Sequence, residues 1–138
     1  MRSVALIPFE RAHLERFEPG RFDREVLEEP YVGVLLRAWP GRAVSAEHDD
    51  RILGIAGASI VQSCAYPWMA LSDEMRRHFP VLLTKLARRA LQSFFEIDGA
   101  TSIEVSARSE FTASGRWLER LGFHAVGQGN DRMRYVRY

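Results

Sequence analysis

Side chains that can exchange protons gather in the short segment Glu47-His48-Asp49-Asp50. Carboxylates and imidazole serve as general acids and bases in many enzymes, so this segment could move a proton during a reaction. The same residues have turn-forming side chains and separate two apolar runs of the sequence. The alternative interpretation is therefore a solvated hairpin tip that does no chemistry.

Two further pairs of residues could donate or accept a proton. Cys64 and Tyr66 lie two positions apart in an apolar run, and Ser109 and Glu110 follow a segment of alternating hydrophobicity. Ordinary strand packing is the alternative for the first pair, and capping of a helix is the alternative for the second. The four histidines and the single cysteine show none of the spacings of a metal site, so we predict no structural or catalytic metal. P-loop, G-x-S-x-G and dinucleotide-binding patterns are missing from the sequence as well.

The composition of the 138 residues is that of a globular protein, with 46% hydrophobic and 27% charged residues. A chain of this length can fold without a metal or a disulfide, so we expect a single domain over residues 1–138. One cysteine rules out an internal disulfide and is typical of a reducing compartment such as the cytoplasm. The sequence has no apolar run of about 18 residues and starts without a signal-peptide pattern, so we expect no membrane partner.

The charge balance argues against nucleic-acid binding, because the net charge is only +1 and nucleic-acid-binding domains are strongly basic. Arg132, Arg134 and Arg137 lie close together near the C-terminus, but alternation along a strand would put Arg137 on the opposite face from the other two. We interpret these arginines as the charged edge of a sheet, which discourages the addition of further strands. No nucleic-acid partner is therefore expected.

The hydrophobic pattern alternates between strands and helices along the chain. A strand is expected at residues 3–9, helices at 10–17, 22–29 and 31–39, and the three strands of a meander at 43–47, 52–60 and 65–71. Pro80 suits the first position of an amphipathic helix. A strand at residues 102–107, a helix at 112–121 that ends at Gly122, and strands at 123–126 and 132–138 complete the series. This order predicts an α/β fold with a mixed sheet.

This order of elements, together with three sequence motifs, resembles the GNAT superfamily of acyl-CoA-dependent N-acyltransferases. The motifs are a strand that ends in Trp68 to Ser72, the segment Arg76-Arg77-His78-Phe79-Pro80 before a helix, and Arg116-Trp117-Leu118 leading to Leu121-Gly122-Phe123. The closest resemblance is to small phage and prophage GNAT-like proteins, including the internal virion protein A group of short-tailed phages. The resemblance implies a single-domain fold in which a mixed, mostly antiparallel sheet is flanked by helices and its central strand pair is splayed.

The resemblance also implies acetyl-CoA as the cofactor and an amine as the acyl acceptor. The free edge of the splayed strand would pair with the pantetheine arm through the backbone of Met69, Ala70 and Leu71. The pyrophosphate would lie at the start of the helix that begins at Pro80, where the amides of the first turn are unpaired. The loop that would wrap the phosphates consists of Arg76, Arg77, His78 and Phe79. The candidate catalytic residues are then Glu47, Tyr66 and Ser109.

The sequence departs from the GNAT pattern in its phosphate loop, which contains no glycine, although glycine lets backbone amides approach a phosphate. Phe111 and Leu118 stand where GNAT proteins carry an asparagine and the tyrosine that protonates the departing thiolate. Two functions are therefore compatible with the sequence: a phage- or prophage-type N-acetyltransferase, and a catalytically inert GNAT-fold virion or host-interaction protein. The first would act in the cytoplasm of a bacterium or an infected host. The second would have phage or host proteins as partners and could be part of a virion.

Overall fold

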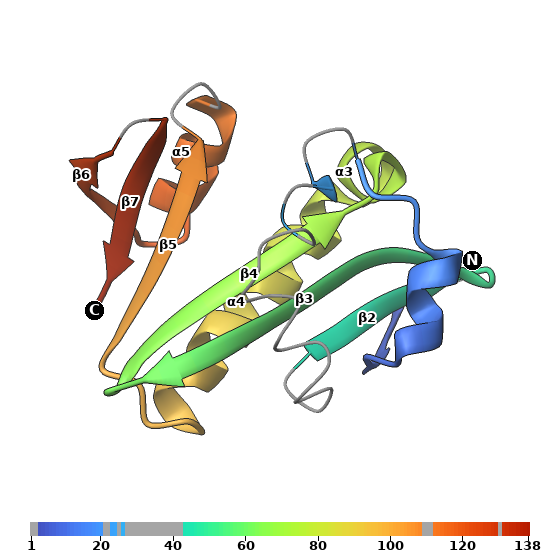
Figure 1. The fold of residues 1–138 in the computed structure, drawn as a ribbon, viewed down its shortest axis with the longest axis horizontal. Coiled ribbons are helices and arrows are strands. Elements are labelled where there is room, and N and C mark those ends of the chain that lie inside the picture. Colours follow the sequence, from blue (N-terminus) through green and yellow to red (C-terminus); the bar gives the residue numbers. More distant parts are fainter. Residues whose placement is uncertain (1–2, 21–22, 25, 27–42, 109–111, 130) are drawn as a thin grey trace. The chain divides into compact units, whose positions relative to one another are not determined.

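The computed structural model describes residues 3–20, 23, 24, 26, 43–108, 112–129 and 131–138. Its strands form a mixed seven-stranded sheet in the order β1-β2-β3-β4-β5-β7-β6, accompanied by helices (Figure 1). This architecture confirms the predicted α/β fold. The expected helix at residues 31–39 lies outside the described residues, and so does most of the expected helix at residues 22–29.

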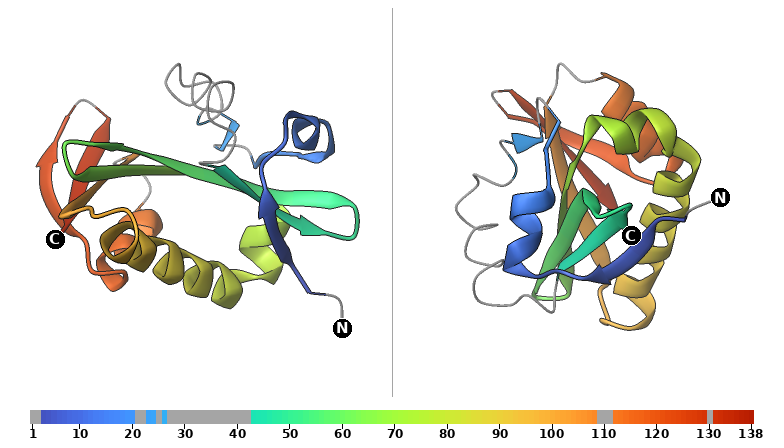
Figure 2. Two further views of the ribbon diagram at one scale, coloured as in Figure 1. Left: turned by 90° about the horizontal axis from the view of Figure 1, so that it is seen from below. Right: turned by 90° about the vertical axis from the view of Figure 1, so that its right-hand side faces the viewer.

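The first of two compact units contains the described parts of Met1–Ser59 and Trp68–Lys85. Its elements are β1 (Ala5–Pro8), the 3-10 helix η1 (Arg11–Arg16), β2 (Ala43–His48), most of β3 (Arg51–Val61), the end of β4 (Cys64–Leu71), α3 (Asp73–His78) and the start of α4 (Pro80–Glu96). β1 pairs with β2 and β2 with β3, both antiparallel. In this unit η1 lies on one face of the strands and the start of α4 on the other (Figure 2). The buried cluster that holds the unit together is Phe9, Phe17, Ala43, Ile52, Ile55, Trp68 and Ala70.

Helix α3 corrects the expectation of a phosphate loop in this unit. Arg76, Arg77 and His78 lie in the helix, and Phe79 is its C-terminal cap. Ser72 explains the helix, because its Oγ accepts a hydrogen bond from the backbone N–H of Met75 at 3.1 Å. The acidic side chains of the first turn also favour a helix at this point.

The segment at residues 10–17 forms a 3-10 helix rather than the expected α-helix. Phe17 is already extended, with φ −112° and ψ 125°, and forms an isolated parallel bridge with Ile52. The chain therefore leaves the helix after six residues to join the sheet.

The second unit consists of Ile60–Pro67 and the described parts of Leu86–Tyr138. Besides the start of β4 and the rest of α4, it contains β5 (Ser102–Arg108), α5 (Thr112–Arg120), β6 (His124–Gln128) and β7 (Arg132–Arg137). Among the described residues, β4 and β5 are paired in parallel only at Cys64↔Ser102 and Ala65↔Ile103, as expected for a splayed pair. β7 is antiparallel to both β5 and β6. The core of this unit is Ala65, Leu91, Ala100, Ile103, Leu118, Leu121, Phe123 and Tyr135.

The position of β7 corrects the interpretation of its arginines as the charged edge of a sheet. β7 lies between β5 and β6, so β6 is the edge strand. Arg134 donates a hydrogen bond to Glu104 of β5, and Arg132 lies 3.5 Å from Ser106 of the same strand.

Gly122 has the expected left-handed conformation, with φ 96°. In the described ranges, every helix is too short or too polar to cross a lipid bilayer.

Candidate functional site

The end of β4 is held from two sides within the first unit. On one side, the backbone N–H of Ser72 donates to the carbonyl of Leu53 in β3, at 2.8 Å. On the other side, the N–H of Leu71 donates to Oδ1 of Asp23 at 3.1 Å, and the carbonyl of Leu71 accepts from the N–H of Gly20 at 2.8 Å. Neighbouring residues of a strand direct their backbone groups to opposite sides. Gly20 and Asp23 therefore occupy the edge of β4 that faces away from β3.

Asp23 also binds Arg76 of α3. Its Oδ1 lies 2.7 Å from a terminal guanidinium nitrogen of Arg76, and its Oδ2 lies 3.3 Å from Nε. The side chain of Asp23 is 7% exposed, whereas that of Arg76 is 47% exposed. A buried carboxylate is stable only when hydrogen bonds and an opposite charge replace its hydration. Leu71 and Arg76 supply both.

Gly20 fits against Asp23 and the end of β4 because it has no side chain. A Cβ atom at this position would lie 2.9 Å from Oδ2 of Asp23, 2.9 Å from Oδ1 of Asp73 and 3.2 Å from the carbonyl oxygen of Leu71. The first two distances are shorter than any ordinary contact of a Cβ atom. The close approach of Gly20 to Asp23 and to the end of β4 therefore depends on glycine.

The predicted cofactor-binding residues of β4 are Met69, Ala70 and Leu71. Ala70 is completely buried and Leu71 nearly so, while Met69 is half-buried. Only Leu71 of these three has backbone groups bound to Gly20 and Asp23. Because alternate residues face the same way, the backbone of Met69 shares the side of Leu71.

The predicted phosphate-binding residues lie in and after α3, in different surroundings. Arg76 is bound to Asp23, as described, whereas the side chain of Arg77 is 73% exposed and approaches Asp73 at only 3.8 Å. His78 is exposed. The carbonyl of Phe79 accepts a hydrogen bond from the backbone N–H of Leu83 at 2.9 Å, at the start of α4. The structure thus gathers Leu71 and Arg76 around Asp23 and leaves Arg77 and His78 exposed.

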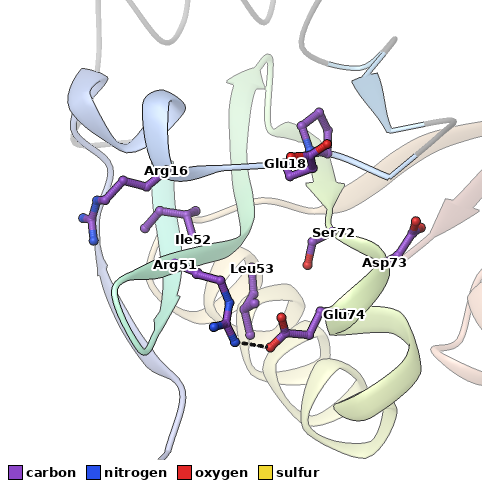
Figure 3. A pocket seen from close by; sticks show the side chains of 9 residues that line it. Arg16, Glu18, Arg51, Ile52, Leu53, Ser72, Asp73 and Glu74 are labelled. Atoms are coloured by element: carbon purple, nitrogen blue, oxygen red, sulfur yellow. Dashed lines mark hydrogen bonds and ion pairs between the residues drawn. The ribbon is translucent and has the colours of Figure 1, made fainter.

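A pocket of about 290 Å³ opens beside the start of α3 (Figure 3). Its lining residues are Arg16, Glu18, Pro19, Arg51, Ile52, Leu53, Ser72, Asp73 and Glu74. Arg51 and Glu74 form an ion pair at 2.7 Å, and the hydrogen bond and charge of Glu74 raise the pKa of Arg51. Two cations and three carboxylates therefore share this lining with apolar side chains of β3.

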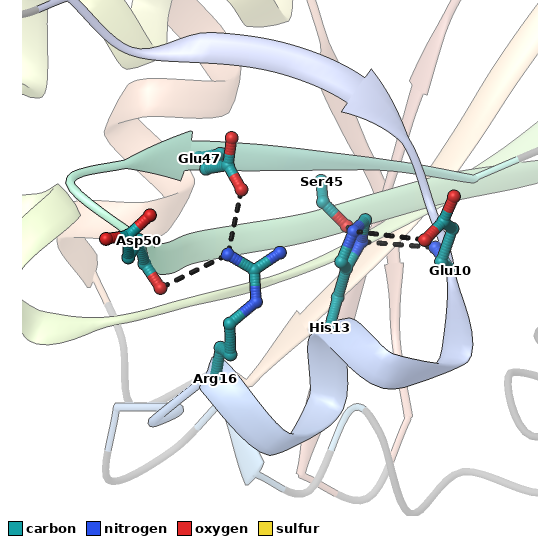
Figure 4. Close-up of polar contacts among 6 residues, drawn as sticks. All are labelled: Glu10, His13, Arg16, Ser45, Glu47 and Asp50. Atoms are coloured by element: carbon teal, nitrogen blue, oxygen red, sulfur yellow. Dashed lines mark hydrogen bonds and ion pairs between the residues drawn. The ribbon is translucent and has the colours of Figure 1, made fainter.

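The candidate catalytic residue Glu47 takes part in a surface ion pair. Arg16 of η1 donates to Oε2 of Glu47 at 2.8 Å and to the backbone carbonyl of Asp50 at 3.2 Å (Figure 4). Asp49 and Asp50 have φ values of 51° and 63° and close a two-residue turn between β2 and β3. The segment is thus the tip of the β2–β3 hairpin, and the contact with Arg16 links Glu47 to η1.

The candidate Tyr66 lies in a polar group of the second unit. The pKa of its phenol is raised, first by a hydrogen bond with the side chain of Cys64 and then by nearby negative charge that includes Glu104. Arg134 acts in the opposite direction, and it donates to Glu104 across the β5–β7 pair. Tyr66 is therefore a phenol that keeps its proton beside a carboxylate and a guanidinium.

Ser109 and Glu110 lie outside the described residues. Asp23, by contrast, accepts hydrogen bonds from Leu71 and Arg76 at the end of β4, but it was not among the predicted site residues. Its partners Leu71 and Arg76 are 48 and 53 positions away, so no local pattern could have indicated them. Among the described residues, no group of three or more histidine, cysteine, aspartate or glutamate side chains could hold a metal ion.

Comparison with known proteins supports one assignment of the fold. No family model matches the sequence, and no curated protein matches it. A GNAT-family acetyltransferase from Staphylococcus aureus Mu50 superimposes with a TM-score of 0.74 at 13% identity, over 98% of each chain. The chain has the GNAT fold.

Two further GNAT-fold structures match over nearly their whole length. The PaiA N-acetyltransferase from Thermoplasma acidophilum, in complex with coenzyme A, gives a TM-score of 0.70 at 14% identity, over 98% of each chain. A chimera of the spermidine N-acetyltransferase SpeG from Vibrio cholerae and hSSAT gives 0.68 at 16% identity, over 97% of this chain and 94% of that one. At these identities the likeness concerns the fold.

Proposed function

We propose that this GNAT-fold protein is an N-acyltransferase, which transfers an acetyl group from acetyl-CoA to an amine. The observation that carries the proposal is the likeness to acetyltransferases over nearly the whole of both chains. One of these fold neighbours, the PaiA N-acetyltransferase, is in complex with coenzyme A. Coenzyme A is proposed as the cofactor because of this PaiA complex, and acetyl transfer is proposed because these fold neighbours are acetyltransferases.

The proposed cofactor site consists of the end of β4 and the start of α4. Beyond Ala65, the described residues of β4 have no ladder partner on β5, so the pantetheine arm would bind along Met69, Ala70 and Leu71, through the backbone groups of Met69 and Leu71 that face this edge. In the first turn of the 17-residue helix α4, Pro80 has no N–H and Leu83 donates to Phe79, so the N–H groups of Val81 and Leu82, at the positive end of the helix dipole, would bind the pyrophosphate. Arg77, exposed beside this helix end, would add a cation.

The reaction needs an unprotonated amine, a polarised thioester carbonyl and a proton for the leaving thiolate. The amine nitrogen would attack the carbonyl carbon, the C–S bond would break, and the nitrogen would lose a proton to solvent. Tyr66 is the proposed donor of the proton to the CoA sulfur, because a phenol whose pKa is raised still holds its proton at neutral pH. Glu47 is less suited to this step because Arg16 already binds its carboxylate.

A second candidate function is that of a catalytically inert GNAT-fold protein of the phage or prophage type, with phage or host proteins as partners. Leu118, at the position of the GNAT tyrosine, is 9% exposed within the apolar core of the second unit and has no proton to donate. The edge groups of Leu71, at the proposed pantetheine site, are already hydrogen-bonded to Gly20 and Asp23. Both observations favour a protein that has kept the fold without turnover.

An assay of CoA release separates the two candidates. The protein is incubated with acetyl-CoA and one amine at a time, chosen from small amines, amino acids and peptides. Spermidine is included because one fold neighbour is a spermidine N-acetyltransferase chimera. The proposed enzyme releases thiol with one class of amine, and the release falls about 100-fold in Tyr66→Phe, as expected for loss of a general acid. Tyr138→Phe, at an 80% exposed position, is the control and should keep full activity. Background hydrolysis with every amine would contradict the enzyme and favour the inert protein.

A further inference from the structure

Asp23 makes contacts that suit an oxygen-bearing ligand. Its carboxylate accepts one hydrogen bond from the backbone N–H of Leu71, at 3.1 Å, and two from the guanidinium of Arg76, at 2.7 and 3.3 Å. A backbone N–H and a guanidinium are the donors that proteins use for carbonyl and phosphate oxygens. We propose that Asp23 is an internal competitor for these donors, which a CoA-type ligand must displace. This inference rests on the proposed function, because that function puts the cofactor at the same strand end.

The contacts of Gly20 extend the competition to the backbone. The N–H of Gly20 donates to the carbonyl of Leu71 at 2.8 Å, so Gly20 and Asp23 together satisfy both edge groups of Leu71. A pantetheine amide would need these same two groups, because it pairs as a short strand would. The backbone of Met69, on the same side of β4, is not part of this contact. The competitor therefore covers the last residue of the strand edge and leaves the rest of that edge to the ligand.

The exposures of the two charged side chains favour exchange. Asp23 is 7% exposed and would regain its hydration on release, while Arg76 is 47% exposed and reachable from solvent. A phosphate group carries more negative charge and more acceptor oxygens than one carboxylate, and it binds a guanidinium with the same two-point geometry. The ligand binds only the molecules in which Asp23 has left the site. Its apparent affinity is therefore lowered in proportion to the fraction of such molecules.

Two substitutions weaken the competitor by independent routes. Asp23→Asn keeps a side-chain oxygen for the N–H of Leu71 but removes the charge that holds Arg76. Gly20→Ala keeps Asp23 but adds a Cβ atom 2.9 Å from its Oδ2 and 3.2 Å from the carbonyl oxygen of Leu71, so the contacts of position 20 and Asp23 with β4 are weakened. Glu74→Gln is the matched control, because it removes the 2.7 Å ion pair with Arg51 in the same unit and leaves Leu71 and Arg76 untouched.

Calorimetric titration of the full chain with CoA tests the proposal. We expect Asp23→Asn and Gly20→Ala to bind CoA about tenfold more tightly than the wild type, and Glu74→Gln to bind within about twofold of it. A wild type that binds CoA, with Asp23→Asn binding equally or more weakly, would overturn the competition and leave the proposed function standing. If Gly20→Ala fails to fold, Asp23→Asn alone decides. No binding by any folded variant would overturn the proposed function and the competition together.

Discussion

Oγ of Ser45 lies 2.8 Å from Nδ1 of His13, and both side chains are buried. The same Nδ1 accepts a hydrogen bond from the backbone N–H of Glu10 at 3.1 Å, at the start of η1. Figure 4 shows the histidine between the two, so it joins η1 to β2. His13 is therefore a structural residue.

His13→Ala should lower the free energy of unfolding by about 2–3 kcal/mol, because it removes packed volume and leaves the Ser45 hydroxyl and the Glu10 amide without this partner. Urea unfolding followed by circular dichroism measures the change. His124→Ala, at an exposed position of β6, is the control and should stay within about 0.5 kcal/mol of the wild type. Equal effects of the two substitutions would contradict the structural role of His13.

Ser72→Ala should lower the free energy of unfolding by about 1 kcal/mol, because the cap of α3 loses its acceptor for the Met75 amide. Ser93→Ala removes the same atom from the interior of α4, where the hydroxyl donates to the carbonyl of Ala90. A bond of that kind adds little to a helix, so we expect almost no change there. The same urea experiment compares the two, and a larger effect at Ser93 would refute the assignment of the cap.

The phenol of Tyr66 should ionise at a higher pH than an ordinary tyrosine. Its pKa in the folded protein is raised above the unfolded value of 10.0, so the contact stabilises the fold below pH 10.0 and is lost as the pH rises through the folded-state pKa. Ultraviolet titration of tyrosinate should show one late step that disappears in Tyr66→Phe. In Cys64→Ala this step should move toward pH 10. An unchanged step would contradict the effect of Cys64 on the pKa of Tyr66.

Arg77→Ala should weaken CoA binding by about 1–2 kcal/mol, because a guanidinium paired with phosphate is lost. The side chain is 73% exposed, so its removal should leave the stability of the fold unchanged. Arg88→Ala, on the exposed side of α4, is the control for net charge. Calorimetry with CoA at two salt concentrations measures both. Equal losses in the two variants would mean that Arg77 acts through charge alone and does not contact the phosphates.

Much of the sheet and the long helix could be predicted, because their signals are local. The apolar steps after Pro80 and the alternation from Ser102 specify α4 and β5 with little help from distant residues. Gly122 marks the end of α5 for the same reason, since only its own conformation is involved. Helix α3 also has a local signal, because Ser72 is followed by two acidic residues, although the resemblance implied a phosphate loop at this place.

The features that could not be predicted depend on partners far away in the chain. Asp23 falls in the segment predicted as a helix at residues 22–29, and no local signal indicates its contact with Leu71, which lies 48 positions away. The order of the last strands is likewise absent from local patterns, because either β6 or β7 could have been placed next to β5. Long-range pairing therefore decides which residues meet at the candidate site, while local chemistry decides only which elements carry them.

Thermal unfolding with and without acetyl-CoA tests the central claim most directly. A ligand at 100 times its dissociation constant stabilises a protein by about 2.7 kcal/mol, which raises the midpoint of a domain of this size by several degrees. We predict this rise for acetyl-CoA and for CoA, and none for ATP at the same concentration. An unchanged midpoint at millimolar acetyl-CoA, or an equal rise with ATP, would contradict a specific cofactor site on this fold.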